Sequence, residues 1–174
     1  PIIEALTGLG VAVSAPGGGP ASSLPFTVHG SGEVRGGHLI IDASASSQFV
    51  SALLLAGARF TGGLHLEHVG KPVPSLDHIN MTVAVLRGVG VAVDDSVPNH
   101  WVISPGPIRA FDQRIEQDLS NAGPFLAAAL ATGGTVRIPN WPAPTTQVGD
   151  LWREQMKVRN SAAALKGLSR VKKR

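Results

Sequence analysis

The feature of this sequence that most constrains its fold is an internal repeat with a long period. One apolar strand pattern ends on Asp42, and a second, 76 residues later, ends on Asp118. Each is followed by a small polar turn, an apolar helix pattern and a Gly-Gly pair. Gly10 and Gly90, 80 residues apart, each stand between a helix pattern and the sequence Val-Ala-Val. Because this period exceeds those of the common solenoids, we expect a few large units that close into globular domains.

One copy of the repeat is nearly whole, between Arg35 and Ile103. Its hydrophobic patterns predict strands at residues 38–42, 64–69, 91–93 and 101–103, and helices at residues 49–56 and 75–86. The strand at 64–69 alternates strictly, so one of its faces should be apolar and the other polar. In the second helix, Met81, Val85 and His78 are expected on one face. The unit therefore has the order βαβαββ, and the fold class is α/β.

Partial copies of the repeat flank this unit. Before it, the patterns predict a helix at residues 1–9 and strands at residues 11–13 and 26–29. After it, they predict a strand at residues 114–118, a helix at residues 124–131 and a strand at residues 135–138.

Charge is distributed very unevenly along the chain. Residues 1–152 carry 7 Lys/Arg against 11 Asp/Glu, whereas residues 153–174 carry 8 Lys/Arg against Glu154 alone. No nucleic-acid partner is therefore expected except through this basic tail, for which a solvated end is the simplest interpretation. The sequence has no cysteine, no apolar run of the roughly 18 residues that a membrane span needs, and no signal-peptide pattern. A cytoplasmic protein without disulfides, metal or cofactor is expected.

The most informative stretch for chemistry runs from Asp42 to Phe49. It places serine hydroxyls, including those of Ser46 and Ser47, between a strand and the start of a helix. Helix N-termini present unpaired N–H groups and the positive end of a dipole, so they bind phosphate. Gln48 follows and could donate to a second group. The alternative is that the serines only cap the helix.

Ser75 raises the same question at the start of the second helix. It stands where an N-cap is expected, and Asp77 follows in the first turn. The other polar candidates favour structural roles. His65 and His68 are three apart in a strand and should point to opposite faces, a poor metal pair. Asp42 and Asp118 stand at equivalent positions of the repeat and could be catalytic, but residues at such positions more often fix a strand-to-helix turn by accepting hydrogen bonds from its amides.

The residues 41–49, Ile-Asp-Ala-Ser-Ala-Ser-Ser-Gln-Phe, resemble the shikimate-phosphate loop of 3-phosphoshikimate 1-carboxyvinyltransferases, most closely the actinobacterial type. Pro74-Ser75, Pro98 to Trp101 and Glu116 to Asn121 resemble further segments of that family. The resemblance implies an inside-out α/β barrel fold of two domains, each built from three βαβαββ units. It also implies transfer of an enolpyruvyl group from phosphoenolpyruvate to shikimate 3-phosphate.

The resemblance assigns substrate-binding roles, residue by residue. Ser46, Ser47 and Ser75 would hold the substrate phosphate, and Gln48 would contact both substrates. His78 stands where some members place an aromatic side chain that stacks on the substrate.

The resemblance runs from Pro1 to about Glu154, so an incomplete fold is expected. Residues 1–113 would be part of one domain, with one whole unit plus the end of the preceding one. Residues 114–154 would begin the second domain, and residues 155–174 would be a basic tail of uncertain origin. The family segments with the acid/base carboxylate and the phosphoenolpyruvate-binding arginines are not in this sequence. No catalytic residue is therefore assigned, and the chain alone should be inactive.

Two alternatives remain open from the sequence. A UDP-N-acetylglucosamine enolpyruvyl transferase would share the fold, but that family lacks the Ser-Ser-Gln loop and uses a Cys acid in many members. A non-catalytic module that binds RNA or another anion through its basic tail is the second, and salt-dependent binding would indicate it.

Overall fold

The structure is a computed structural model that describes residues 1–153, and the chain divides into two units. Unit 1 is Pro1–Asp112, and unit 2 is Gln113–Arg174. The basic tail predicted at residues 155–174 lies outside the described residues. None of the helices within residues 1–153 has both the length and the hydropathy that a membrane crossing requires.

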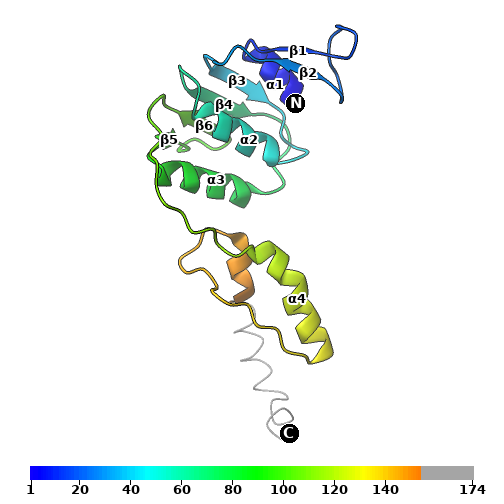
Figure 1. Cartoon of the computed structure of the whole chain (residues 1–174), viewed down its shortest axis with the longest axis vertical. Helices are drawn as coiled ribbons and strands as arrows, with labels where there is room; N and C mark the ends of the chain where they lie inside the picture. The colour runs from blue at the N-terminus through cyan, green and yellow to red at the C-terminus, as the bar shows by residue number, and fades with distance from the viewer. Residues whose placement is uncertain (154–174) are drawn as a thin grey trace, which may run out of the picture. The chain divides into compact units, whose positions relative to one another are not determined.

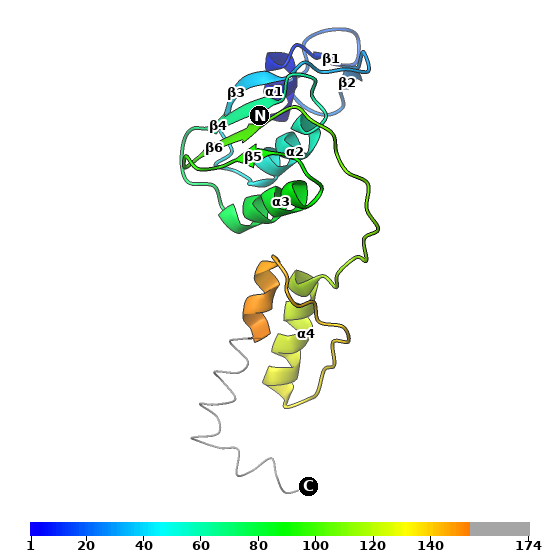
Figure 2. The ribbon, with the colours of Figure 1, turned by 90° about the vertical axis from the view of Figure 1, so that its left-hand side faces the viewer.

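Unit 1 is built on a four-stranded sheet in the order β3-β4-β6-β5 (Figure 2). Its strands are β3 (Gly37–Ile41), β4 (Leu64–His68), β5 (Val93–Asp94) and β6 (His100–Ile103). The helix α2 (Gln48–Gly57) connects β3 to its parallel neighbour β4, and α3 (Leu76–Gly88) leads from β4 to the antiparallel pair β5 and β6. The predicted βαβαββ order is confirmed.

The core of unit 1 lies between this sheet and its two helices, which lie side by side on one face (Figure 1). Period-two alternation places one set of strand side chains in the core. In the pairing register, Leu39 is opposite Leu66, and Leu66 is opposite Trp101, and all three are buried. His38, His65 and Glu67 belong to the other face. The strict alternation predicted for β4 is thus confirmed.

Helices α2 and α3 each bury one stripe of side chains against the sheet. In α2 the stripe is Val50, Leu53 and Leu54. In α3 it is Ile79, Val83 and Leu86, at i, i+4 and i+7. Burying such a side chain stabilises a fold by about 1.5–3 kcal/mol. Met81, Val85 and His78, which the sequence placed on one face, are not among these buried residues: Val85 is 54% exposed, His78 is also exposed, and Met81 is partly buried.

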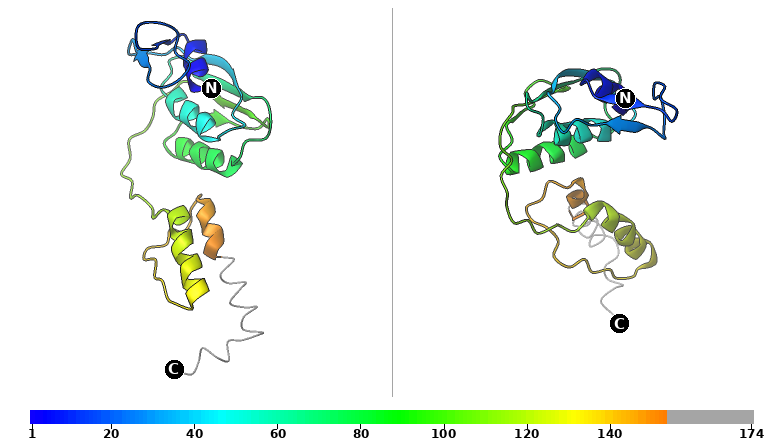
Figure 3. Two further views of the ribbon diagram at one scale, coloured as in Figure 1. Left: turned by 90° about the vertical axis from the view of Figure 1, so that its right-hand side faces the viewer. Right: turned by 45° about the horizontal axis from the view of Figure 1, so that its top comes forward.

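The part of unit 1 that precedes the sheet consists of α1 (Ile2–Gly8) and a hairpin of β1 (Ala12–Ser14) and β2 (Thr27–His29). All three elements were predicted. Helix α1 packs against β1 and β3 and adds Ala5 to the core, while the hairpin forms a separate two-stranded sheet (Figure 3).

In unit 2 the described residues form α4 (Leu119–Thr132) and a short 3₁₀ helix (Val148–Asp150). The strands predicted at residues 114–118 and 135–138 are absent from this described part. At the end of the first of these segments, backbone groups of Gln117 and Leu119 are hydrogen-bonded to the side chain of Gln147 rather than to a neighbouring strand. Gln147 Nε2 donates to Gln117 O at 2.9 Å, and Leu119 N donates to Gln147 Oε1 at 2.9 Å. A strand pattern forms a strand only where a partner strand is available.

The start of α4 differs from the predicted boundary. The apolar pattern predicted a helix at residues 124–131. The helix begins five residues earlier, at Leu119, because Asp118 caps it. The Asp118 carboxylate accepts hydrogen bonds from Asn121 N at 3.0 Å and Asn121 Nδ2 at 2.8 Å. The predicted bonding of turn amides by Asp118 is confirmed, although residues 114–118 form no strand before it.

Candidate functional site

The candidate site is built from the two loops that follow the parallel strands β3 and β4. Parallel strands end at the same edge of a sheet, and ligands of open α/β sheets bind beyond this carboxyl edge. Loop 1 (residues 42–47) leads into α2, and loop 2 (residues 69–75) leads into α3. The starts of both helices therefore belong to one edge of unit 1.

Two serines occupy the N-cap positions of these helices without making the usual capping bond. Ser47 is the N-cap of α2 and Ser75 is the N-cap of α3, and neither side chain bonds to an amide of its own helix. Ser47 is 5% exposed and Ser75 is partly buried. In contrast, Asp118 does cap α4. Capping therefore does not account for the hydroxyls of Ser47 and Ser75.

The other predicted site residues lie close by in the chain but differ in exposure. Ser46 Oγ accepts a hydrogen bond from Gln48 N at 3.2 Å, so this hydroxyl already orders the turn. The Gln48 side chain is on the first helical residue of α2 and is exposed. His78 is exposed in the first turn of α3. One turn further on, Thr82 Oγ1 and Ser51 Oγ are 3.0 Å apart and connect the two helices.

Asp42 orders loop 1 from its first residue. Its carboxylate accepts hydrogen bonds from the Ser44 hydroxyl and from Ser44 N, the latter at 2.9 Å. These two bonds, with a smaller contribution from the positive charge of Lys71, hold the pKa of Asp42 below its usual range. The role predicted for Asp42, fixing a strand-to-helix turn, is confirmed.

The lowered pKa of Asp42 predicts a pH dependence of stability. Because the unfolded chain binds this proton more tightly, the stabilisation is complete above the ordinary carboxyl pKa of about 3.9 and is lost as pH falls through the folded value. Urea denaturation between pH 2.5 and 6 should show a smaller acid loss in Asp42→Asn than in the parent chain. Asp94, whose pKa is also lowered, by bonds from Ser96, titrates in both proteins and cancels. Identical pH profiles would contradict the role of Asp42.

Loop 2 approaches loop 1 closely at Gly70. Its φ of +108° is in the region that favours glycine, and a Cβ added there would lie 2.8 Å from both Asp42 Oδ1 and Ser44 Oγ. Ser44 Oγ is also 3.0 Å from Lys71 O. Sequence reasoning did not single out Gly70 or Ser44 for this contact, because the contact joins residues that are about 26 positions apart.

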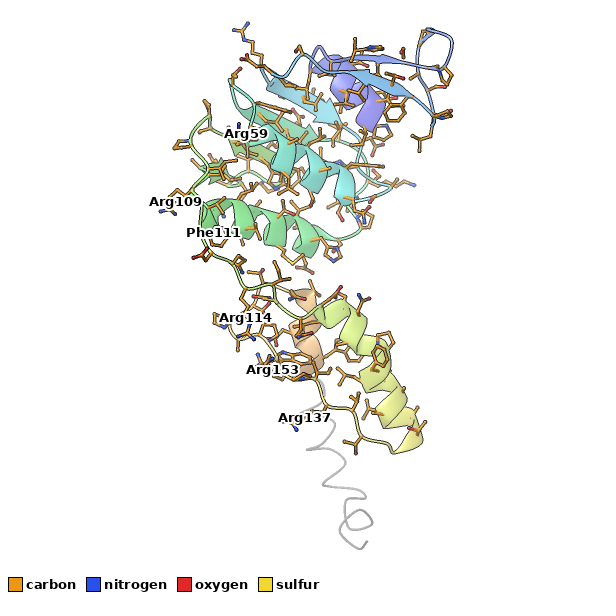
Figure 4. The ribbon with its side chains drawn as sticks, viewed as in Figure 1. Arg59, Arg109, Phe111, Arg114, Arg137 and Arg153 are labelled. Carbon is orange, nitrogen blue, oxygen red and sulfur yellow. The ribbon has the colours of Figure 1, made fainter. Side chains whose placement is uncertain are left out.

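The positive charges of unit 1 lie mostly away from the starts of α2 and α3. Arg59 follows the last turn of α2, and Arg109 lies beside the end of α3 (Figure 4). Arg109 N donates to Val89 O at 2.9 Å, and Arg87, in the last turn of α3, pairs with Asp95 at 2.7 Å. Lys71, in loop 2, is the cation near the candidate site. The polar groups that these two loops and helix starts present are therefore chiefly amides and hydroxyls.

The histidines do not form a metal centre in the described part of the chain. The prediction that His65 and His68 point to opposite faces is confirmed, because His68 is 5% exposed in the core whereas His65 stacks on His38 at 4.4 Å. Within residues 1–153 no group of three or more His, Asp or Glu side chains is arranged to hold a metal ion.

A cavity of about 430 Å³ lies elsewhere in unit 1. It is lined by Leu6 of α1, Val28 of β2, Leu53 of α2 and Phe60 of the turn that follows α2, among others. None of the predicted site residues contributes to it, so it carries no part of the phosphate-site argument.

Comparisons with known proteins agree on one family. The family model described as EPSP synthase (3-phosphoshikimate 1-carboxyvinyltransferase) matches residues 1–166, past Glu154, where the sequence analysis expected the likeness to end. A 3-phosphoshikimate 1-carboxyvinyltransferase of Mycobacterium ulcerans (strain Agy99) is 55% identical over 147 residues, which are 84% of this chain. The chain spans 33% of the length of that relative.

Two solved structures of EPSP synthase from Acinetobacter baumannii resemble the fold. Each has a TM-score of 0.51 and 23% sequence identity to this chain, and the match covers 74% of this chain and 27% of the other. These values support the incomplete enolpyruvyl transferase fold that was predicted. The match of the family model to residues 1–166 shows that this chain belongs to the EPSP synthase (3-phosphoshikimate 1-carboxyvinyltransferase) family.

Proposed function

We propose that this chain supplies part of the shikimate 3-phosphate site of an enzyme that transfers the enolpyruvyl group of phosphoenolpyruvate to that substrate. The observation that supports this most is the pair of N-cap serines, Ser47 and Ser75, that do not cap their own helices. In this proposal both hydroxyls, with Ser46, donate to the substrate phosphate. The helix amides beside them contribute further donors.

Two further contacts to the substrates are proposed for exposed side chains at the starts of α2 and α3. Gln48, exposed at the first position of α2, contacts both substrates, and His78, exposed in the first turn of α3, stacks on the shikimate ring. The two small-molecule substrates are the proposed partners, and the proposed location is the cytoplasm. No residue of this chain is assigned a catalytic role.

The test is a titration of the 174-residue chain with shikimate 3-phosphate, in which binding is measured from the NMR shifts of the backbone amides. Hydrogen bonds to a charged group contribute about 1.5–3 kcal/mol each, and association costs about 4 kcal/mol or more. Three or four such bonds give about 4.5–12 kcal/mol, and the middle of that range exceeds the association cost by about 4 kcal/mol, which corresponds to an affinity of about 1 mM. Ser47→Ala and Ser75→Ala should each weaken binding about ten-fold or more, because each removes one bond to the phosphate.

Ser120→Ala is the matched control, since Ser120 is an exposed serine in the first turn of α4 in the other unit. It should bind as the parent chain does. Shifts confined to residues 155–174, or unchanged affinity in the Ser47 and Ser75 variants, would show that the phosphate site is wrong and would favour an anion-binding tail.

A further inference from the structure

One buried polar side chain at this edge of the sheet is not part of the proposed contacts to substrate. Within residues 1–153 the buried polar or charged side chains are Ser47 and His68, each 5% exposed. His68 is the last residue of β4 and points to the core face, in phase with Leu64 and Leu66. An imidazole is buried at such a position only when its nitrogens are hydrogen-bonded.

Both nitrogens of His68 are bonded, one to each loop of the candidate site. Ala43 N, in loop 1, donates to His68 Nδ1 at 3.1 Å. The other nitrogen, Nε2, is 2.8 Å from the carbonyl oxygen of Lys71 in loop 2. Because a backbone N–H can only donate, Nδ1 must accept, and Nε2 carries the proton and donates to Lys71 O. One neutral tautomer satisfies both loops.

The atoms that His68 contacts belong to the turns that present the serines. Ala43 is completely buried, and its carbonyl oxygen accepts from Ser46 N at 3.0 Å. The Lys71 carbonyl that accepts from His68 is also 3.0 Å from Ser44 Oγ. The imidazole thus lies at the junction of loop 1 and loop 2 and is hydrogen-bonded to the backbones of both.

We propose that His68 is a positioning residue that sets the distance between the starts of α2 and α3, and so the fit of Ser46, Ser47 and Ser75 to one phosphate group. This inference rests on the proposed function for its ligand, but the geometry it describes is independent of that ligand. Misplacement of binding groups by about 1 Å can cost up to 10²-fold in function. Loss of either bond should therefore weaken phosphate binding although His68 does not touch the substrate.

Two substitutions of His68 each keep one of its two hydrogen bonds and remove the other. In His68→Asn the side-chain oxygen lies near the place of Nδ1 and can still accept from Ala43 N, but the amide does not reach Lys71 O. In His68→Gln the terminal nitrogen lies near the place of Nε2 and can still donate to Lys71 O, while Ala43 N loses its acceptor. His65→Asn is the matched control: the same change in the same strand, on the opposite face.

Amide hydrogen exchange and amide shifts of the unliganded 174-residue chain test the positioning directly. We expect exchange at Ala43 to rise about ten-fold in His68→Gln and to stay near the parent rate in His68→Asn. Both variants should shift the amides of residues 44–48, of Val73 and of residues 75–77, and both should bind shikimate 3-phosphate at least about five-fold more weakly. His65→Asn should leave all these quantities unchanged.

The outcomes separate the two proposals. If the parent chain does not bind shikimate 3-phosphate, the proposed function fails, while the shifts and exchange of the unliganded variants still decide the role of His68. If the amides of both loops are unchanged in His68→Asn and His68→Gln, or if His65→Asn moves them equally, His68 is not a positioning residue. A loss of thermal stability in the His68 variants with unchanged loop amides and unchanged affinity would also overturn the proposal.

Discussion

Leu54→Ala should lower the free energy of unfolding of unit 1 by about 2–5 kcal/mol, the range measured for buried leucines. Leu54 is fully buried in α2, on the stripe that faces the sheet. The substitution removes apolar contacts and leaves a cavity, because the helix is tied at both ends and cannot collapse into it. Urea denaturation followed by far-UV circular dichroism should show a lower midpoint with an unchanged slope.

Leu55→Ala is the matched control for this prediction. Leu55 is the next residue of the same helix and is 51% exposed. Its substitution should change the free energy of unfolding by no more than about 0.5 kcal/mol, as is usual for exposed positions. Equal losses in the two variants would contradict the burial stripe assigned to α2.

The 174-residue chain should show no enolpyruvyl transfer above background when it is given both substrates. Shikimate 3-phosphate and phosphoenolpyruvate are polyanions, and burying their charge without paired cations is costly. The described site offers hydroxyls, an amide, an imidazole and Lys71, while Arg59, Arg87 and Arg109 lie at the far ends of α2 and α3. No residue of this chain is assigned as general acid or base, a role that contributes about 10²–10⁴-fold to a rate. The rate of enolpyruvyl transfer is measured as phosphate release, with a full-length family member as the positive control.

The Ser47→Ala variant shows whether any residual phosphate release comes from this chain or from a contaminant. Phosphate release by a contaminant would be the same in both preparations. Phosphate release that is present in the parent chain and lost in Ser47→Ala would contradict the prediction, because it would mean that these 174 residues form a working site.

The amino-acid sequence by itself determined the architecture of unit 1. The repeat that relates Asp42 to Asp118 and Gly10 to Gly90, with strict alternation in β4, predicted the βαβαββ order and the two faces of the sheet. These features are local: strand and helix periods are set by which neighbouring side chains meet the core. The loop sequence at Asp42 to Phe49 likewise indicated the family that the comparisons show. The assignments of single residues to the substrates remain predictions.

Only the tertiary structure decided three other features, and each depends on residues far apart in the chain. The strand patterns at 114–118 and 135–138 form no strand in the described part, because a strand needs a partner and Gln147 bonds near the first of them instead. The buried face of α3 is set by the sheet beneath it, so Ile79 is in the core and Val85 is exposed. From the sequence, His68 was considered only as one member of a possible metal-binding pair with His65, which the strand geometry disfavoured. Its bonds to Ala43 and Lys71 exist because the parallel pairing of β3 and β4 brings two loops to one edge, and the spacing of residues along a chain does not specify which edges meet.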